Sequence, residues 1–129
     1  MGAPASLEQV ASTDHLTPTF SFKHVDDANY MLHEWEKDEI RQLVARLKMM
    51  EHMTWHLIKA SGGYGKSSGG LGFKPLKLQT LHCRVPDYIA NQHTLTEFRV
   101  SSKMRVMGFR EGGVFSIVWF DRTHDVTGS

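Results

Sequence analysis

The last third of the chain contains three strand-like runs, and they constrain the fold more than any other feature. Residues 96–100, 104–109 and 114–120 are rich in Val, Phe, Ile and Trp, and the gaps at 101–103 and 110–113 hold serine, charged residues and glycine. Runs of this kind with short turn-forming gaps are typical of β-hairpins. We therefore predict a β-meander of two hairpins. The last run is apolar on both faces, which places it inside the sheet.

The preceding segments add one strand and one or two helices. Residues 19–25 alternate Phe and Val with polar residues, the period of a half-buried strand. From Asp38 onward apolar residues recur three and four positions apart, which predicts an amphipathic helix with Asp38 as its N-cap. Thr54 caps a second short helix, unless the first helix continues to the glycines at 62–63. Residues 76–81 are a further candidate strand.

These elements predict an α+β fold, in which one or two helices pack on one face of an antiparallel sheet. The 129 residues, 40% of them hydrophobic, suit one domain and are too few for a doubly wound nucleotide enzyme or a TIM barrel. We expect a flexible leader at 1–18, a single domain at 19–126 with a mobile glycine-rich loop at 61–75, and a tail at 127–129.

Cysteine content and hydropathy bear on the compartment. The single cysteine, Cys83, excludes an internal disulfide framework and fits a reducing cytoplasm. No run approaches the roughly 18 apolar residues of a membrane-spanning helix. We therefore expect a cytoplasmic protein that does not bind a membrane.

The net charge of +1 conceals an uneven distribution of charge. Residues 1–58 hold five basic and nine acidic side chains, whereas residues 59–129 hold ten basic and five acidic ones. The two parts therefore carry net charges of −4 and +5. A basic second half indicates an anionic partner, with phosphate the commonest candidate, although a short chain can also carry such an imbalance on ordinary solvated surface.

Two motifs have alternative explanations. Residues 60–67 match a relaxed phosphate-loop pattern. That site needs a strand before the loop and a helix after it, whereas here a helix precedes the loop and glycines follow it. His52 and His56 share a face if they lie on one helix, and His82 is a possible third zinc ligand. The order of residues is wrong for the HExxH motif, and histidines at the surface or at the edge of the core explain the pattern as well.

A more specific group lies at the end of the meander. His124 follows the last strand, while Arg105 and Arg99 alternate with apolar residues on the two strands before it. An arginine that holds a phosphate and an imidazole that moves a proton suit phosphodiester chemistry. Each of these side chains taken alone is also an ordinary residue of a polar sheet face.

The element order and the last strands resemble the RelE/YoeB/ParE superfamily of bacterial toxins. The likeness in residues is confined to 97–125. It consists of the Met104-Arg105-Val106-Met107-Gly108-Phe109 strand, the turn at 112–113 and the aliphatic strand that ends in a histidine-containing turn. The resemblance implies a β-α-α-β-β-β fold. It also implies an endoribonuclease that cuts messenger RNA on the ribosome by attack of a 2′-hydroxyl on the adjacent phosphate, with no metal or other cofactor.

The resemblance also implies roles for particular residues. Arg105 matches the phosphate-contacting arginine, and His124 matches the histidine that acts as general acid. Glu97 is a candidate base because it lies close by in the meander. Arg99 and Lys103 would contact phosphate. Further phosphate-binding candidates are the basic residues of the glycine-rich loop and the second hairpin: Lys66, Lys74 and Arg110.

The implied partners are RNA and a protein antitoxin. Two departures from the family are the near-neutral charge and the long segment at 61–95. The superfamily includes members without nuclease activity, so a non-catalytic module of the same fold that binds RNA or protein stays open as an alternative. A zinc enzyme that uses His52, His56 and His82 is a third, weaker one.

Overall fold

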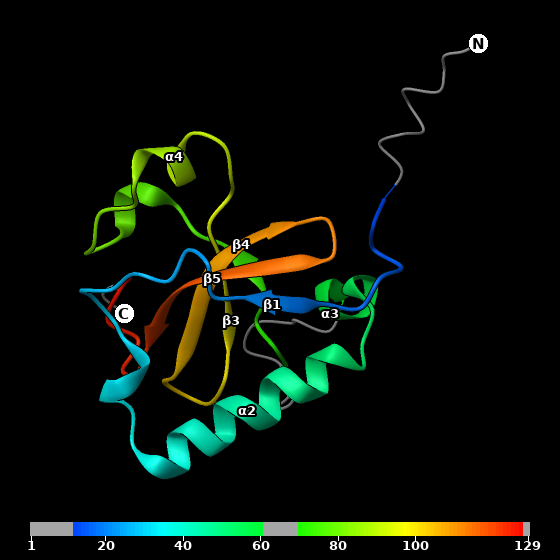
Figure 1. The fold of residues 1–129 in the computed structure, drawn as a ribbon, viewed down its shortest axis with the longest axis horizontal. Helices are drawn as coiled ribbons and strands as arrows, with labels where there is room; N and C mark the ends of the chain where they lie inside the picture. Colours follow the sequence, from blue (N-terminus) through cyan, green and yellow to red (C-terminus); the bar gives the residue numbers. More distant parts are fainter. Residues whose placement is uncertain (1–11, 61–69, 128–129) are drawn as a thin grey trace.

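The computed structural model describes residues 12–60 and 70–127, which have the predicted α+β fold (Figure 1). The helices are α2 (Lys37–Glu51), α3 (Trp55–Ala60) and α4 (Asp87–Ala90), with short 3-10 turns at Leu32–Glu34 and Leu78–Thr80. The strands are β1 (Thr19–Ser21), β2 (Lys74–Pro75), β3 (Thr96–Arg99), β4 (Arg105–Glu111) and β5 (Val114–Asp121). Within the described ranges the strands form one sheet in the order β1-β5-β4-β3-β2.

The predicted β-meander is present as β3, β4 and β5. β3 pairs antiparallel with β4, and β4 pairs antiparallel with β5. The β4–β5 turn contains Gly112 at a φ of 61°, a left-handed conformation that glycine adopts without steric cost. β5 lies between β1 and β4, inside the sheet as its apolar composition predicts.

The prediction of an entirely antiparallel sheet is wrong at β1. This strand runs parallel to β5, with Thr19 opposite Val114 and Ser21 opposite Ser116, so the sheet is mixed. It is also shorter than predicted, because a turn follows in which the Val25 N–H donates to the Phe22 carbonyl at 3.2 Å. Alternation along a strand indicates which face is buried, but it contains no information about the direction of the neighbouring strand.

The two helices after β1 are separate. Glu36, not Asp38, is the N-cap of α2, and its backbone N–H donates to Glu39 Oε1 at 2.7 Å in a capping box. Glu39 is the third residue of the helix, so the reciprocal bonds fix the start at Lys37. α3 begins after Thr54, whose Oγ1 accepts a hydrogen bond from the Leu57 N–H at 3.2 Å. The prediction of a second helix that Thr54 caps is therefore confirmed.

Hydrophobic clusters cover both faces of the sheet, so helices do not pack on one face alone as expected. Cluster 1 lies between the sheet and α2 and α3 and includes Trp55. Cluster 2 lies on the opposite face, where Ile89 of α4 packs with Trp119 of β5. Figure 1 shows α2 and α4 on opposite sides of the sheet.

Two predictions about the middle of the chain also change. Residues 78–80 form a 3-10 turn rather than a strand, since Leu76 and Leu81 pack against cluster 2. The end of the expected mobile loop, residues 70–75, contains buried Leu71 and strand β2, whereas residues 61–69 lie outside the described chain.

The N-terminal leader is also shorter than expected. Within it, the Leu16 carbonyl accepts a hydrogen bond from the Trp55 N–H at 2.9 Å, and the Asp14 carbonyl accepts one from the His56 N–H at the same distance. The folded part therefore begins before residue 19, while residues 1–11 are outside the described ranges. Among the described helices, none has the length and apolar character needed to cross a membrane.

Candidate functional site

A row of charged residues crosses three neighbouring strands at the end of the β3–β4 hairpin. Arg99 of β3 lies opposite Arg105 of β4, which lies opposite Asp121 of β5. Each of the three alternates with a residue of cluster 1, so all three side chains lie on the face that carries cluster 2. Directly opposite residues of a sheet have Cβ atoms about 5 Å apart, which makes this row a continuous charged cluster.

Glu97 of β3 and Lys74 of β2 form a second charged row beside the first. Lys74 of β2 lies opposite Glu97, and its Nζ is 3.9 Å from Glu97 Oε2. Arg105 Nε is 4.0 Å from the same oxygen. Glu97 therefore lies between two cations, one from the edge strand and one from the central strand.

Asp121 closes the turn that carries His124. Its carboxylate is fully buried and accepts hydrogen bonds from the Asp125 and Val126 backbone N–H groups, both at 2.9 Å. These bonds fold the segment after β5 back onto the sheet. His124 lies within this turn at a φ of 61°, a left-handed conformation that is uncommon for a residue with a side chain.

The electrostatics of His124 reflect the charged rows. Burial and the positive charge of Arg105 lower the pKa of His124, Asp121 opposes the shift, and Lys74 and Arg99 lower the pKa further. The imidazole is therefore neutral at physiological pH. A neutral imidazole is ready to accept a proton, which suits a general base better than a general acid.

Glu97 and Arg105 lie beneath the surface. Arg105 is buried, and its Nη1 donates to the carbonyls of Ser101 at 2.9 Å and Ser102 at 3.1 Å, which fixes the hairpin turn. Glu97 is 1% exposed, and its Oε1 makes no hydrogen bond to any residue in the described ranges. Burial raises the pKa of Glu97, Lys74 and Arg105 oppose the rise, and Asp121 adds to it. Both side chains are almost inaccessible to solvent.

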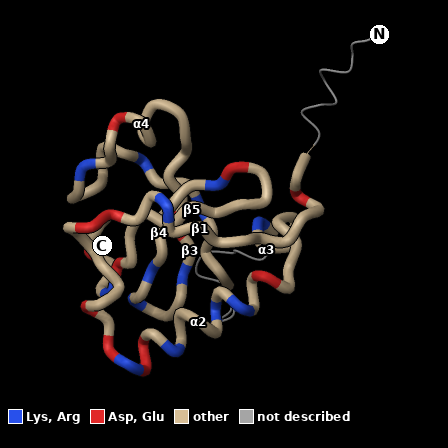
Figure 2. Tube along the Cα trace, in the orientation of Figure 1, with Lys and Arg blue, Asp and Glu red and all other residues tan. Residues whose placement is uncertain are grey.

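A cavity of about 500 Å³ lies at the same end of the meander, on the side that α2 covers, and none of the residues of the charged rows lines it. Its walls come from α2, the β3–β4 turn and the segment after β5, and the lining residues are Glu39, Gln42, Ser101, Ser102, Lys103, Met104, Arg122 and Thr123. In Figure 2, Lys and Arg positions gather on the ends of β3 and β4 that approach α2. Arg122 is held by Glu39, with Nε 2.6 Å from Oε1, whereas Lys103 is exposed.

The structure therefore brings together most of the site residues selected from the sequence. Those gathered near the end of the meander are Lys74, Glu97, Arg99, Lys103, Arg105 and His124. Arg110 is not part of the group, because it lies at the other end of β4, with its guanidinium 4.4 Å from the Trp55 ring centroid. Lys66 and nearly all of the phosphate-loop pattern are outside the described residues.

The three candidate zinc ligands do not form a group. His52 caps the end of α2 and His56 lies in the separate helix α3, so they do not share the face of one helix. The His82 N–H donates to the Val126 carbonyl, beside cluster 2. Within residues 12–60 and 70–127, no three His, Cys, Asp or Glu side chains are placed to hold a metal ion.

Sequence reasoning missed two members of the charged cluster. Asp121 reads as a solvated turn residue, although an aspartate directly after a strand and before a polar turn is a typical acceptor for backbone N–H groups. Arg46 of α2 donates to the Val100 carbonyl at 3.3 Å, and burial together with the charge of Arg99 lowers its pKa. No local pattern connects Arg46 with the meander, since their contact depends on how α2 packs.

No family model, curated protein or solved structure gives a significant match to this chain. The resemblance to the RelE/YoeB/ParE superfamily therefore stays a prediction. Arguments about function rest on the residues and geometry of the site.

Proposed function

We propose that the protein is a metal-independent endoribonuclease of the RelE-like type, with its active site at the charged end of the meander. The observation that carries the proposal is the position of His124, within electrostatic reach of Arg99, Arg105 and Lys74 and directly after Thr123, which lines a cavity together with Lys103. Perturbed pKa values gathered beside a cavity are typical of catalytic sites. The order of two helices followed by a β-meander is also what the resemblance implies.

In this proposal an RNA strand crosses the end of the meander, and Lys103 and Arg99 bind its phosphates. His124 accepts the proton of a ribose 2′-hydroxyl, and the oxygen attacks the adjacent phosphorus. The bond from phosphorus to the 5′-oxygen breaks, which leaves a 2′,3′-cyclic phosphate. The departing oxygen takes a proton from the imidazolium or from water. Glu97 and Arg105 position the site from beneath, and a protein antitoxin is the expected partner.

The deciding test is cleavage of an end-labelled oligoribonucleotide by the purified protein in the presence of EDTA, with and without bacterial ribosomes. We expect products with 2′,3′-cyclic phosphate ends and no cleavage where the attacking ribose is 2′-deoxy. His124→Asn keeps a residue that tolerates the left-handed backbone but lacks an imidazole, and it should slow cleavage by about 100-fold or more.

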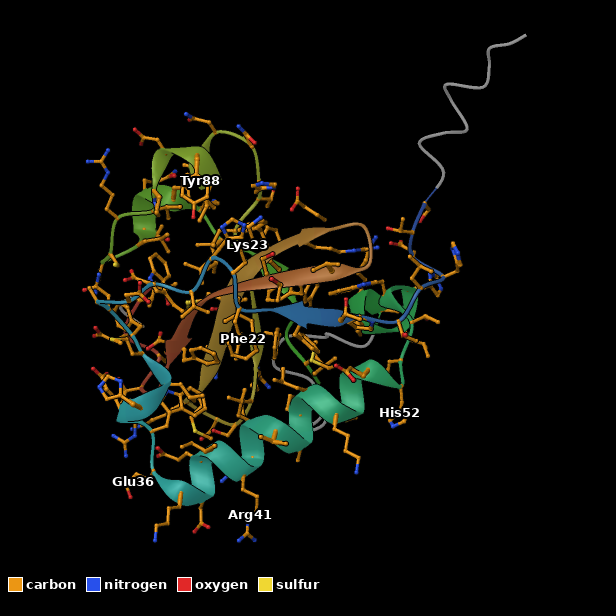
Figure 3. The ribbon with its side chains drawn as sticks, viewed as in Figure 1. Phe22, Lys23, Glu36, Arg41, His52 and Tyr88 are labelled. Atoms are coloured by element: carbon orange, nitrogen blue, oxygen red, sulfur yellow. The ribbon has the colours of Figure 1, made fainter. Side chains whose placement is uncertain are left out.

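His52→Asn is the matched control, because His52 lies at the opposite end of α2 from Glu36 (Figure 3) and does not line the cavity. This variant should cleave like the native protein. The rate should rise with pH through the pKa of His124 and level off by neutral pH, because that pKa is below its ordinary value. In bacteria, induction should arrest growth, and His124→Asn should relieve the arrest. Robust growth with abundant folded native protein would refute the proposal.

The burial of Glu97 and Arg105 favours a second candidate, a module of the same fold that binds RNA without cutting it. This function needs Lys103 and Arg99 but not proton transfer. It predicts intact RNA and an affinity that falls steeply with salt. Lys103→Gln should weaken binding, Lys48→Gln on the exposed face of α2 should not, and His124→Asn should have little effect.

A further inference from the structure

A second cavity, of about 550 Å³, lies at the other end of the meander. Its walls come from α3, β2, β4 and the segment before β3, and its lining residues are Lys59, Phe73, Pro75, Gln92, His93, Thr94, Thr96 and Arg110. It shares no lining residue with the cavity that Lys103 lines. The proposed nuclease chemistry does not use it.

Two cations of this cavity hold a single carboxylate between them. Lys59 Nζ is 2.8 Å from Asp14 Oδ2, and Arg110 Nη2 is 2.8 Å from Asp14 Oδ1. These two contacts lower the pKa of Asp14 to about 2, so its carboxylate is charged throughout the physiological range. Each oxygen of the carboxylate is therefore bound by a different cation. Two oxygens of a phosphate group can be bound by two cations in the same arrangement.

Arg110 is held rigidly in position. Its Nε donates to the Gly112 carbonyl at 2.7 Å, and its guanidinium lies over the Trp55 ring. The side chain is 18% exposed, so it reaches the cavity from a packed base. An arginine fixed in this way loses little conformational entropy when it binds an anion.

The remaining walls combine hydrogen-bonding groups with apolar surface. Thr94 and Gln92 are exposed side chains at the rim, and Phe73 and Pro75 supply apolar area. The His93 ring is stacked on Phe109 with its centroid 4.0 Å away, which fixes its plane. A concave site of a few hundred Å³ that combines fixed polar groups with apolar surface can orient a small organic ligand.

We propose that this cavity binds a phosphate monoester with a planar organic part, of the nucleoside monophosphate class. Lys59 and Arg110 bind the phosphate, and the organic part lies against Phe73 and Pro75. Asp14, from the segment before β1, occupies the phosphate position in the free protein. The carboxylate of Asp14 therefore competes with the phosphate of the ligand for Lys59 and Arg110. This site is independent of the proposed nuclease activity.

The test is calorimetric titration of the full-length protein with adenosine monophosphate, inorganic phosphate and adenosine. We expect the monophosphate to bind most tightly and adenosine to bind least. Lys59→Gln should weaken binding of the monophosphate by about tenfold, the effect of losing one charged hydrogen bond. Asp14→Asn should strengthen it by a similar factor, because the competing charge is gone while the backbone contacts of residue 14 remain.

Lys37→Gln, at the exposed start of α2, is the charge-matched control and should leave the affinity unchanged. His124→Asn should also leave it unchanged, which separates this site from the nuclease site. The proposal is overturned if Asp14→Asn, folded by circular dichroism, binds the monophosphate no more tightly than the native protein. It is also overturned if Lys59→Gln binds as the native protein does, or if inorganic phosphate binds as well as the monophosphate.

Discussion

Glu97 combines burial with neighbouring cations, and its raised pKa shows that burial has the larger effect. A carboxyl group whose folded pKa exceeds its unfolded value stabilises the protein below the unfolded pKa, and this stability is lost as the pH rises through the folded pKa. The change that Glu97→Gln causes in the free energy of unfolding should therefore be about 1 kcal/mol more stabilising at pH 8 than at pH 4. Urea denaturation at both pH values measures this difference.

Glu34→Gln is the control, because Glu34 is exposed in the 3-10 turn before α2. Its effect should not change between the two pH values. If Glu97→Gln had the same effect on stability at both pH values, or a less favourable one at pH 8, the attraction of Lys74 and Arg105 for the carboxylate would outweigh the effect of burial.

The β4–β5 hairpin depends on a glycine at an irregularity in its register. The pairing shifts between Met107 and Gly108, so that Gly108 lies opposite Ile117. A Cβ atom at Gly108 would meet the Ser116 carbonyl oxygen at 2.0 Å and Phe115 Cε2 at 2.9 Å. Because one of these atoms is backbone, Gly108→Ala should lower the free energy of unfolding by about 3 kcal/mol or prevent folding.

Gly113→Ala is the matched control in the same hairpin. A Cβ there would lie 3.2 Å from Leu16 Cδ1, the far end of a flexible side chain. This variant should stay within about 1 kcal/mol of the native protein in urea denaturation. Equal stabilities for the two variants would contradict the need for glycine at the register shift.

The whole molecule should unfold as one unit, because the strands of the meander contribute side chains to both hydrophobic clusters. β5 places Phe115 in cluster 1 and Trp119 in cluster 2. Leu43→Ala in cluster 1 and Ile89→Ala in cluster 2 should each lower the free energy of unfolding by about 2–5 kcal/mol. In both variants, fluorescence and far-ultraviolet circular dichroism should report a single shared transition. A separate early transition in Ile89→Ala would show that cluster 2 unfolds independently.

Elements set by neighbouring residues could be predicted from the sequence. The three runs of the meander, the amphipathic spacing from Ile40 to Met50 and the Thr54 cap are local signals, and each corresponds to an element of the fold. The predicted start of α2 differs from the observed one because Asp38 and Glu36 both lie near it, and only the reciprocal bonds with Glu39 select Glu36. The strand predicted at 76–81 is not formed, because an apolar run has the same composition whether it pairs with another strand or packs on the core as a turn.

The candidate site, too, could be predicted from the sequence only in part. Alternation in the meander was enough to place Arg99 and Arg105 on one face, and a histidine after the last strand was visible in the sequence. The burial of Glu97 and Arg105 could not be foreseen. The lowered pKa of His124 also depends on burial, and it favours a base where the resemblance implies an acid.

The sequence by itself determined the α+β class and the meander, because turn residues and hydrophobic period act over a few neighbouring positions. Only the tertiary structure decided that β1 runs parallel to β5, that a second cluster covers the other face and that Asp14 reaches Lys59 and Arg110. These features join positions that are far apart in the chain. Their geometry depends on strand register, helix packing and burial, and no local pattern of residues specifies those.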